Sequence, residues 1–163
     1  EGGGDAGLVH VGMHAVNSLR MEKAYRHWGH DITDEETPLQ GGLGFAVAWD
    51  KPSGFIGKEA LLRLRENANR KRLVQFVLQD PEPLLYHNEP VYRDGQIVGY
   101  ITSGMYGHAL GAAVGLGYVE NIDGVDATIV NTGDYQIEVA GVKIPAKASL
   151  RPLYDPKNER IRV

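Results

Sequence analysis

Cationic and aromatic side chains gather in one short segment of the sequence, residues 18–31, which reads SLRMEKAYRHWGHD. At helical spacing, Arg20, Lys23 and His27 fall on one narrow stripe that could bind an anion. The aromatic residues that could stack on a planar ring are Tyr25, Phe45 and Trp49. Composition alone favours a plainer interpretation, a helix face with ion pairs beside core aromatics. The segment is therefore a candidate site for a flat, anionic ligand.

The histidines raise a second possibility, a metal site. His10 and His14 lie four residues apart, the spacing at which two ligands share one helix face, and a looser cluster comprises His27, His30 and Asp31. Neither group supplies a complete ligand set, and the segment HVGMH lacks the glutamate of a zinc hydrolase helix. Structural or surface histidines are commoner than ligands on such evidence. We therefore predict no metal site.

Two glycine-rich segments resemble nucleotide-binding loops only superficially. In GFIGKEA, residues 54–60, the glycines stand too close together for a phosphate loop, and no Ser or Thr follows Lys58. The segment SGMYGHALGAAVGLG, residues 103–117, lacks the strand, turn and helix of a dinucleotide fold, so its glycines favour bulges and barrel corners. Ser103 and His108 could belong to a hydrolytic triad, but no nucleophile elbow surrounds the serine.

The gross composition excludes several function classes. Lys and Arg number 17 and Asp and Glu 21, a net charge of −4 that gives no electrostatic footprint for nucleic acid. No run approaches the roughly 20 apolar residues that span a bilayer, so the sequence predicts a soluble protein without a membrane partner. The absence of cysteine excludes disulfides and thiolate catalysis and fits a reducing compartment. The glycine-rich start, EGGGDAG, resembles a cut through a longer polypeptide or an expression remnant.

Three elements are expected in the first 70 residues. Helix formers dominate from His10 to Trp28, so we predict a helix there that is apolar on two flanks and ends at Gly29. The apolar run LGFAVAW, residues 43–49, predicts a buried strand. The segment GKEALLRLREN, residues 57–67, predicts a second amphipathic helix.

From about residue 70 the period of the hydrophobic pattern changes from 3.6 to 2, which predicts a module of six short strands. The expected strands cover residues 72–79, 90–101, 113–119, 127–131, 135–139 and 142–150. Asp94-Gly95 and Ala140-Gly141 predict tight hairpin turns. Many short strands with glycine- and proline-rich turns favour a small closed barrel or a jelly roll, because closure removes exposed edges.

The order of the motifs resembles a known family. The segments that carry the resemblance are SLRMEKAYRHWGHDITDEETPLQGGLGF, FIGKEAL, KRLVQFVL, GQIVGYITSG, LGYV and LRPLYDPKNERIR. In this order they closely resemble the C-terminal part of sarcosine and dimethylglycine dehydrogenases. The folate-binding T-protein of the glycine cleavage system shares a looser version. The resemblance covers nearly the whole chain from about Gly7.

This resemblance implies an α+β fold class and a chemistry. In that family a flavin domain oxidises an N-methyl amine, and a folate domain captures the one-carbon unit on tetrahydrofolate. Residues 1–70 would be the C-terminal piece of the central folate-binding α/β domain. Residues 71–163 would form a small antiparallel β-barrel, jelly-roll-like, of the aminomethyltransferase C-terminal type.

The resemblance also implies cofactor-binding residues. Tyr25 falls where some T-proteins place a folate-contacting tyrosine, and Phe45 occupies an aromatic position after the PLQGG turn that would form a wall of the site. T-proteins carry a folate-binding arginine where this chain has Val16, so the nearest cation on that stripe is Arg20. We therefore predict that Arg20, Tyr25 and Phe45 bind tetrahydrofolate. The family's catalytic aspartate, its pterin-binding glutamate and its FAD precede the matching segment, so no catalytic residue is expected in this chain.

Two functions remain open from the sequence. The first is the C-terminal folate-binding portion of an N-methyl-amine dehydrogenase or aminomethyltransferase, inactive alone and partnered by upstream flavin and folate domains of the same polypeptide. The second is a non-catalytic folate-binding or protein-interaction module. In either case we expect the bacterial cytoplasm or the mitochondrial matrix. The choice of amine would belong to the flavin domain.

Overall fold

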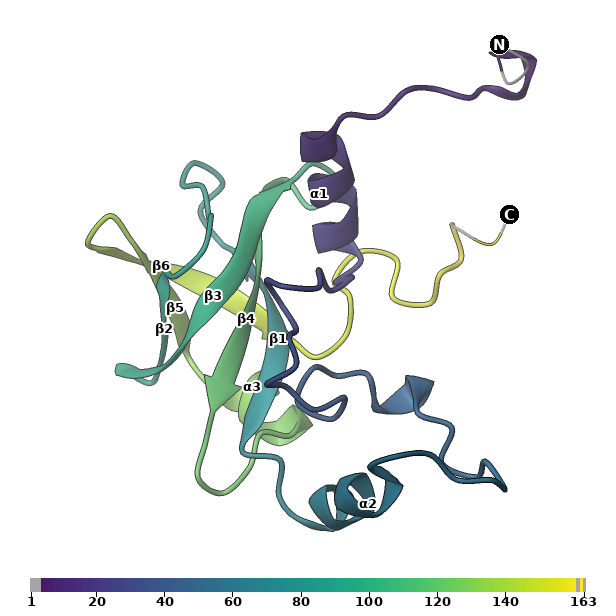
Figure 1. Ribbon diagram of the computed structural model, residues 1–163. Coiled ribbons are helices and arrows are strands. Elements are labelled where there is room, and N and C mark those ends of the chain that lie inside the picture. Colours follow the sequence, from purple (N-terminus) through teal and green to yellow (C-terminus); the bar gives the residue numbers. More distant parts are fainter. Residues whose placement is uncertain (1–3, 161, 163) are drawn as a thin grey trace.

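The computed structural model describes residues 4–160 and residue 162, and it shows a β-barrel with helices and loops beside it (Figure 1). The strands are β1 (Lys71–Leu78), β2 (Pro90–Arg93), β3 (Gln96–Gly107), β4 (Ala112–Glu120), β5 (Tyr135–Val139) and β6 (Val142–Ser149). They close in the order β1-β4-β3-β2-β5-β6, and neighbouring strands are antiparallel. The predicted small antiparallel barrel is confirmed. The outermost parts of the two predicted domains, residues 1–3, 161 and 163, lie outside the described residues.

The two predicted hairpin turns are confirmed by their backbone angles. Asp94 and Gly95 have φ of 51° and 81°, and Ala140 and Gly141 have φ of 50° and 81°. Positive φ at both central residues is what a type I′ turn requires, and this turn matches the twist of the strands that it joins. The first turn joins β2 to β3 and the second joins β5 to β6.

Two apolar clusters hold the barrel and its neighbouring helix together. The first fills the barrel and includes Val74, Phe76, Leu85, Val91, Ile101, Val119 and Ile137. The second lies on the outer face of β1 and β4, under helix α1 (Met13–Glu22), and comprises Met21, Ala24, Leu73, Val114, Leu116 and Tyr118. Alternate residues of β1 and β4 thus belong to different clusters, so both faces of these strands are buried.

Helix α1 is shorter than the predicted helix over residues 10–28. It begins at Met13 and ends at Glu22, and Ala24 then has a φ of 53°, which a continuing helix does not allow. Residues 23–33 instead form a loop around the buried carboxylate of Asp31, which accepts three hydrogen bonds. These bonds favour the loop over further helical turns. The prediction that Gly29 ends the helix is therefore wrong.

Two predicted strands are helical in the structure. Residues 43–49 contain a short 3₁₀-helix, η2 (Gly44–Ala46), whose backbone N–H groups bond locally rather than to a neighbouring strand. Residues 127–131 lie in α3 (Ala127–Thr132), which Asp126 caps by accepting a hydrogen bond of 2.9 Å from the N–H of Ile129. The cap outweighs the β-propensity of the Ile-Val pair.

Before the barrel, the structure confirms the predicted second helix, and its described residues there contain no strand that joins the sheet. The predicted second helix is present as α2 (Lys58–Glu66), and a short 3₁₀-helix, η1 (Gly4–Ala6), lies near the start. In the described part of the chain before Lys71, however, no segment joins the sheet; an isolated bridge pairs Trp28 with Ile32.

The glycine-rich segment over residues 103–117 lies in β3 and β4, as its barrel interpretation predicts. A register shift, the mark of a β-bulge, falls between Ile101 and Ser103. Gly104 permits a close approach, because a Cβ there would collide with the backbone of Leu85. Among the described helices none has the length and apolar character needed to cross a membrane.

Candidate functional site

A pocket of about 510 Å³ lies between the loop that follows α1 and the C-terminal segment. We call residues 150–158 the strap and the cavity the loop–strap pocket. Its walls come from residues 23–45, from the start of β1 and from the strap. Small-molecule sites have volumes of roughly 300 to 1,000 Å³, so the pocket is large enough for one. The side chains with distinctive chemistry in its walls are Lys23, Tyr25, Arg26, Phe45, Arg72 and Arg151.

The structure brings two of the sequence-predicted site residues together at this pocket. Tyr25 lies in the loop after α1 and Phe45 lies in η2, and both line the cavity. Their side chains remain largely uncovered, with exposed fractions of 51% for Tyr25 and 85% for Phe45. Exposed aromatic rings at the mouth of a cavity can stack on a flat ligand, and they contribute little to the core.

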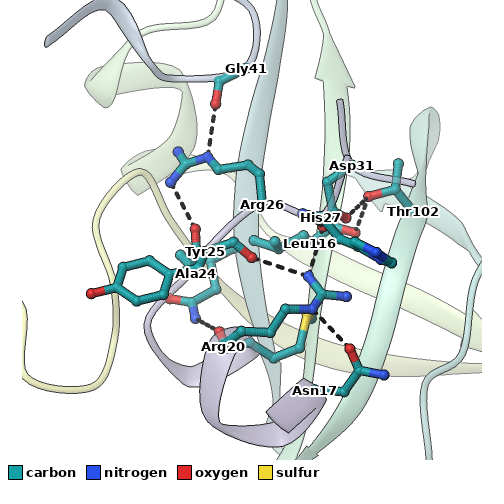
Figure 2. A network of polar contacts seen from close by, with 12 residues as sticks. Asn17, Arg20, Ala24, Tyr25, Arg26, His27, Asp31, Gly41, Thr102 and Leu116 are labelled. Carbon is teal, nitrogen blue, oxygen red and sulfur yellow. Dashed lines mark hydrogen bonds and ion pairs between the residues drawn. The ribbon is translucent and has the colours of Figure 1, made fainter. Parts of the chain in front are cut away.

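The third predicted residue, Arg20, lies outside the pocket walls. Its Nη1 atom forms an ion pair of 2.7 Å with the Oδ2 atom of Asp31 and donates a hydrogen bond of 3.1 Å to the carbonyl of Tyr25. Figure 2 shows the Tyr25 ring pointing away from this polar network, while its carbonyl faces Arg20. Arg20 therefore holds the backbone that carries Tyr25.

Asp31 is the centre of that network. Its side chain is fully buried and accepts hydrogen bonds from Arg20, from the N–H of His27 at 2.8 Å and from the hydroxyl of Thr102 at 2.6 Å (Figure 2). Thr102 belongs to β3, so one carboxylate joins α1, the following loop and the barrel. The hydroxyl of Tyr118 adds a bond of 2.8 Å to the Asp31 carbonyl. The loop that carries Tyr25 is thus fixed to the barrel.

Two arginines that the sequence did not single out line the pocket. Arg26 donates to the carbonyls of Gly41 at 2.9 Å and Ala24 at 2.7 Å, and Arg72 donates to the carbonyl of Leu39. Burial lowers the pKa of both guanidinium groups, and the positive charge of Arg72 lowers the pKa of Arg26 further. In the described part of the chain, neither arginine forms an ion pair.

The strap is tied down by a buried ion pair and a buried amide. Lys23 donates to the carbonyl of Asp155 at 2.5 Å and to its carboxylate at 3.2 Å. The side chain of Gln75 accepts a hydrogen bond of 2.7 Å from the N–H of Leu153 and donates to the carbonyls of Met21 and Glu22 at the end of α1. One pocket wall is therefore held against α1 and β1.

Of the other residues in the predicted cationic and aromatic set, Lys23 lines this pocket, whereas His27 and Trp49 lie outside its walls. Because α1 ends at Glu22, the stripe of Arg20, Lys23 and His27 is not formed; His27 instead stacks on His30 with ring centres 4.8 Å apart. Trp49 donates to the carbonyl of Gly44 at 2.9 Å. No group of three or more His, Asp or Glu residues in the described ranges could hold a metal ion.

The sequence did not indicate Arg26 and Arg72 as site residues, for two different reasons. Arg26 falls within the predicted helix, and its approach to Gly41 depends on the loop that replaces the last helical turns. Arg72 lies near the start of β1, a strand that the sequence identifies by its apolar residues, so its hydrophobic pattern gives Arg72 no functional meaning. No local signal pairs them with Gly41 and Gly42, because other arginines, Arg63, Arg65 and Arg70, lie nearer to these glycines in the sequence than Arg72 does.

Models of known families match both parts of the chain. A model described as the glycine cleavage T-protein C-terminal barrel domain matches residues 71–155. A second model, the GCVT N-terminal domain, matches residues 1–51. The boundary between the two matches leaves α2 outside both.

Individual proteins match over nearly the full chain. A 4-methylaminobutanoate oxidase (formaldehyde-forming) from Paenarthrobacter nicotinovorans is 48% identical over 99% of the chain, and the mitochondrial sarcosine dehydrogenase of Homo sapiens is 36% identical over 98%. The chain spans only 19% and 18% of the length of these relatives. The crystal structure of glycine cleavage system aminomethyltransferase T from Bartonella henselae matches with a TM-score of 0.73 and 26% identity, covering 88% of this chain and 39% of that one.

Proposed function

Because this chain belongs to the glycine cleavage T-protein family, we propose that it is the folate-binding portion of an N-methyl-amine dehydrogenase or of an aminomethyltransferase. In that role it helps to transfer a one-carbon unit to tetrahydrofolate. The loop–strap pocket carries the proposal, because it combines two exposed aromatic rings with arginines that have no carboxylate partner among the described residues. Flat, anionic ligands need both features.

Each predicted residue has a role in this proposal. Tyr25 and Phe45 flank the planar part of the folate, since both rings are exposed at the pocket. Arg20 does not contact the ligand in this proposal. It positions Tyr25, because its hydrogen bond to the Tyr25 carbonyl and its ion pair with Asp31 fix the loop. The charge of Arg20 is already matched, which supports a positioning role.

The chemistry of amine oxidation belongs to other parts of the polypeptide in this proposal. The chain spans about a fifth of the length of its relatives, so upstream flavin and folate domains would supply FAD and the catalytic groups. No catalytic residue is assigned to the present chain. Its own contribution is to bind and orient folate and to close one side of the pocket with the strap.

Calorimetric titration with 5-formyltetrahydrofolate, a stable reduced folate, tests the proposal. We expect saturable binding by the complete polypeptide that contains this chain, and weaker binding by the 163-residue chain alone. An absence of binding heat with the complete polypeptide would remove folate from the function. Binding of equal strength by the isolated chain would instead favour a self-sufficient folate-binding module.

One observation favours the second candidate, a non-catalytic folate-binding or protein-interaction module. The relative from Paenarthrobacter nicotinovorans is named as forming formaldehyde, a product that needs no folate acceptor. Product analysis separates the two candidates. Because free formaldehyde also condenses with tetrahydrofolate without an enzyme, the rates are compared with that uncatalysed background. With an N-methyl amine and tetrahydrofolate present, the first candidate predicts methylenetetrahydrofolate formed faster than the background, whereas the second predicts formation no faster than the background.

A further inference from the structure

The guanidinium groups of Arg26 and Arg72 both lie next to the backbone of Gly42 in the loop–strap pocket. Gly42 has a φ of 74°, and a Cβ atom at this position would lie 2.6 Å from the Nη2 atom of Arg26 and 3.4 Å from the Nη2 atom of Arg72. A side chain would therefore displace the first guanidinium, and the backbone angle also favours glycine. Gly42 leaves room for both arginines at the same point of the pocket.

The arginines are oriented by backbone carbonyls rather than by acidic side chains. Arg26 uses its Nε and Nη1 atoms for Gly41 and Ala24, and Arg72 uses its Nη1 atom for Leu39. Within the described ranges, the Nη2 atom of neither arginine makes a hydrogen bond. Because a guanidinium has five N–H donors, both groups keep donors for a ligand while their orientation is fixed.

The charge of this pair is not balanced by the surrounding side chains. The described residues that line the pocket include no Asp or Glu. Asp31 attracts Arg26 from outside the pocket walls, but burial and the charge of Arg72 outweigh it and lower the pKa of Arg26. Two like charges held together in a half-buried place are unfavourable unless an anion joins them.

The other cations near the pocket differ in this respect. Arg20 is matched by Asp31, and Lys23 is matched by Asp155. Arg151 is exposed to solvent, where a charge needs no partner. The half-buried, unmatched positive charge of this pocket is therefore concentrated at Arg26 and Arg72.

We propose that the Nη2 groups of Arg26 and Arg72 together form a carboxylate-binding subsite that holds the glutamate end of the folate. This inference rests on the proposed function and assigns the anionic end of its ligand. A planar carboxylate offers two oxygens, one for each guanidinium, and charge-assisted bonds of this kind are short and directional. The aromatic residues Tyr25 and Phe45 line the same cavity and serve the planar part of the ligand.

A pair of ligands that differ only in the glutamate tests the subsite. Folate carries two glutamate carboxylates, whereas pteroate ends at the benzoate. We expect the complete polypeptide to prefer folate over pteroate by roughly tenfold or more, the effect of a few charge-assisted hydrogen bonds. Arg26→Gln and Arg72→Gln should each reduce that preference, and the double variant should bind both ligands about equally.

The control is an arginine of the same type outside the pocket. Arg63 is exposed on α2 and does not line the loop–strap pocket, so Arg63→Gln should keep the preference for folate. If the Gln variants melt at much lower temperatures, Arg26→Lys and Arg72→Lys replace them. Lysine retains the charge but not the fixed fork, so it should give an intermediate preference.

The outcomes separate the subsite from the proposed function. An unchanged preference for folate in the double variant would overturn the subsite and leave folate binding intact. Loss of affinity for both ligands by the same factor would also overturn it, because the arginines would then act on the shared ring system. If the unsubstituted polypeptide binds neither ligand, the proposed function itself is wrong, and the glutamate assignment fails with it.

Discussion

The ammonium group of Lys23 lies 3.2 Å from the carboxylate of Asp155, and both side chains are almost completely buried. Lys23 stands at the end of α1, and Asp155 belongs to the strap. The carboxylate also accepts hydrogen bonds from the backbone N–H groups of Glu159 and Arg160, so it organises the turn that follows. This pair connects the end of α1 to the strap that follows the barrel.

Acid should weaken the fold through Asp155. Burial raises the pKa of its carboxyl, but the hydrogen bonds from Lys23, Glu159 and Arg160 outweigh burial and lower the pKa below its ordinary value of 3.8. A carboxylate with a lowered folded-state pKa stabilises the protein above the unfolded-state value, and this contribution is lost as the pH falls through the folded-state value. Urea unfolding from neutral pH to about pH 2 should show this loss.

Asp155→Asn should lower the free energy of unfolding at neutral pH and remove this part of the acid dependence. Asp50 is exposed and serves as the matched control through Asp50→Asn. Equal acid dependence in Asp155→Asn and in the unsubstituted protein would show that the pair does not stabilise the fold.

Replacement of the exposed aromatic rings should affect binding without affecting stability. We expect Tyr25→Ala and Phe45→Ala each to weaken reduced-folate binding by about 3- to 10-fold, the effect of one lost ring stack. Melting temperatures should stay nearly unchanged, because both rings are exposed. Tyr86→Ala provides the control, since Tyr86 is 69% exposed and lies outside the loop–strap pocket. Equal affinities in all three variants would contradict the assigned ring contacts.

Loss of the Asp31 carboxylate should destabilise the fold strongly. Asp31→Ala leaves the Arg20 guanidinium without its carboxylate partner, and it removes the acceptor of the His27 N–H and the nearer of two acceptors of the Thr102 hydroxyl. Breaking a buried ion pair from one side costs about 3 kcal/mol or more. Urea unfolding measures the change, with Asp34→Ala as an exposed control. A loss no larger than that of the control would mean that the network does not fix the loop.

Gln75 should control the attachment of the strap. Gln75→Leu removes the acceptor of the Leu153 N–H and the donor for the Met21 and Glu22 carbonyls. Each buried polar group left without a partner costs about 1–3 kcal/mol. Limited proteolysis should then cut the strap faster than in the unsubstituted protein. Gln96→Leu, at the exposed start of β3, should leave the cleavage rate unchanged.

The barrel was predictable from sequence because its signals are local. Period-two alternation marks β5 and β6, and Asp94-Gly95 needs only the conformational freedom of its own residues. The predictions for residues 43–49 and 127–131 failed because an apolar run does not say whether another strand is available to pair with it. The Asp126 cap was a local signal that the β-branched residues obscured.

The site was less accessible to sequence reasoning, because it depends on contacts between distant segments. Tyr25 and Phe45 could be proposed from their aromatic character, but their meeting at one pocket follows from the loop that Asp31 holds. Arg26 and Arg72 lie close together because β1, which carries Arg72, packs beside that loop. Whether a cation already has a partner cannot be read from spacing, as the ion pair of Arg20 illustrates.

Closure of the barrel through β1 and β6 places its beginning and its end side by side. Ser149, the last residue of β6, pairs with Gln75, the fifth residue of β1. The chain therefore enters and leaves the ring of strands at neighbouring points. Segments that precede and follow the ring consequently emerge on the same side and can build one cavity between them. The closed barrel therefore brings the strap, which follows β6, beside α1 and the loop that precede β1.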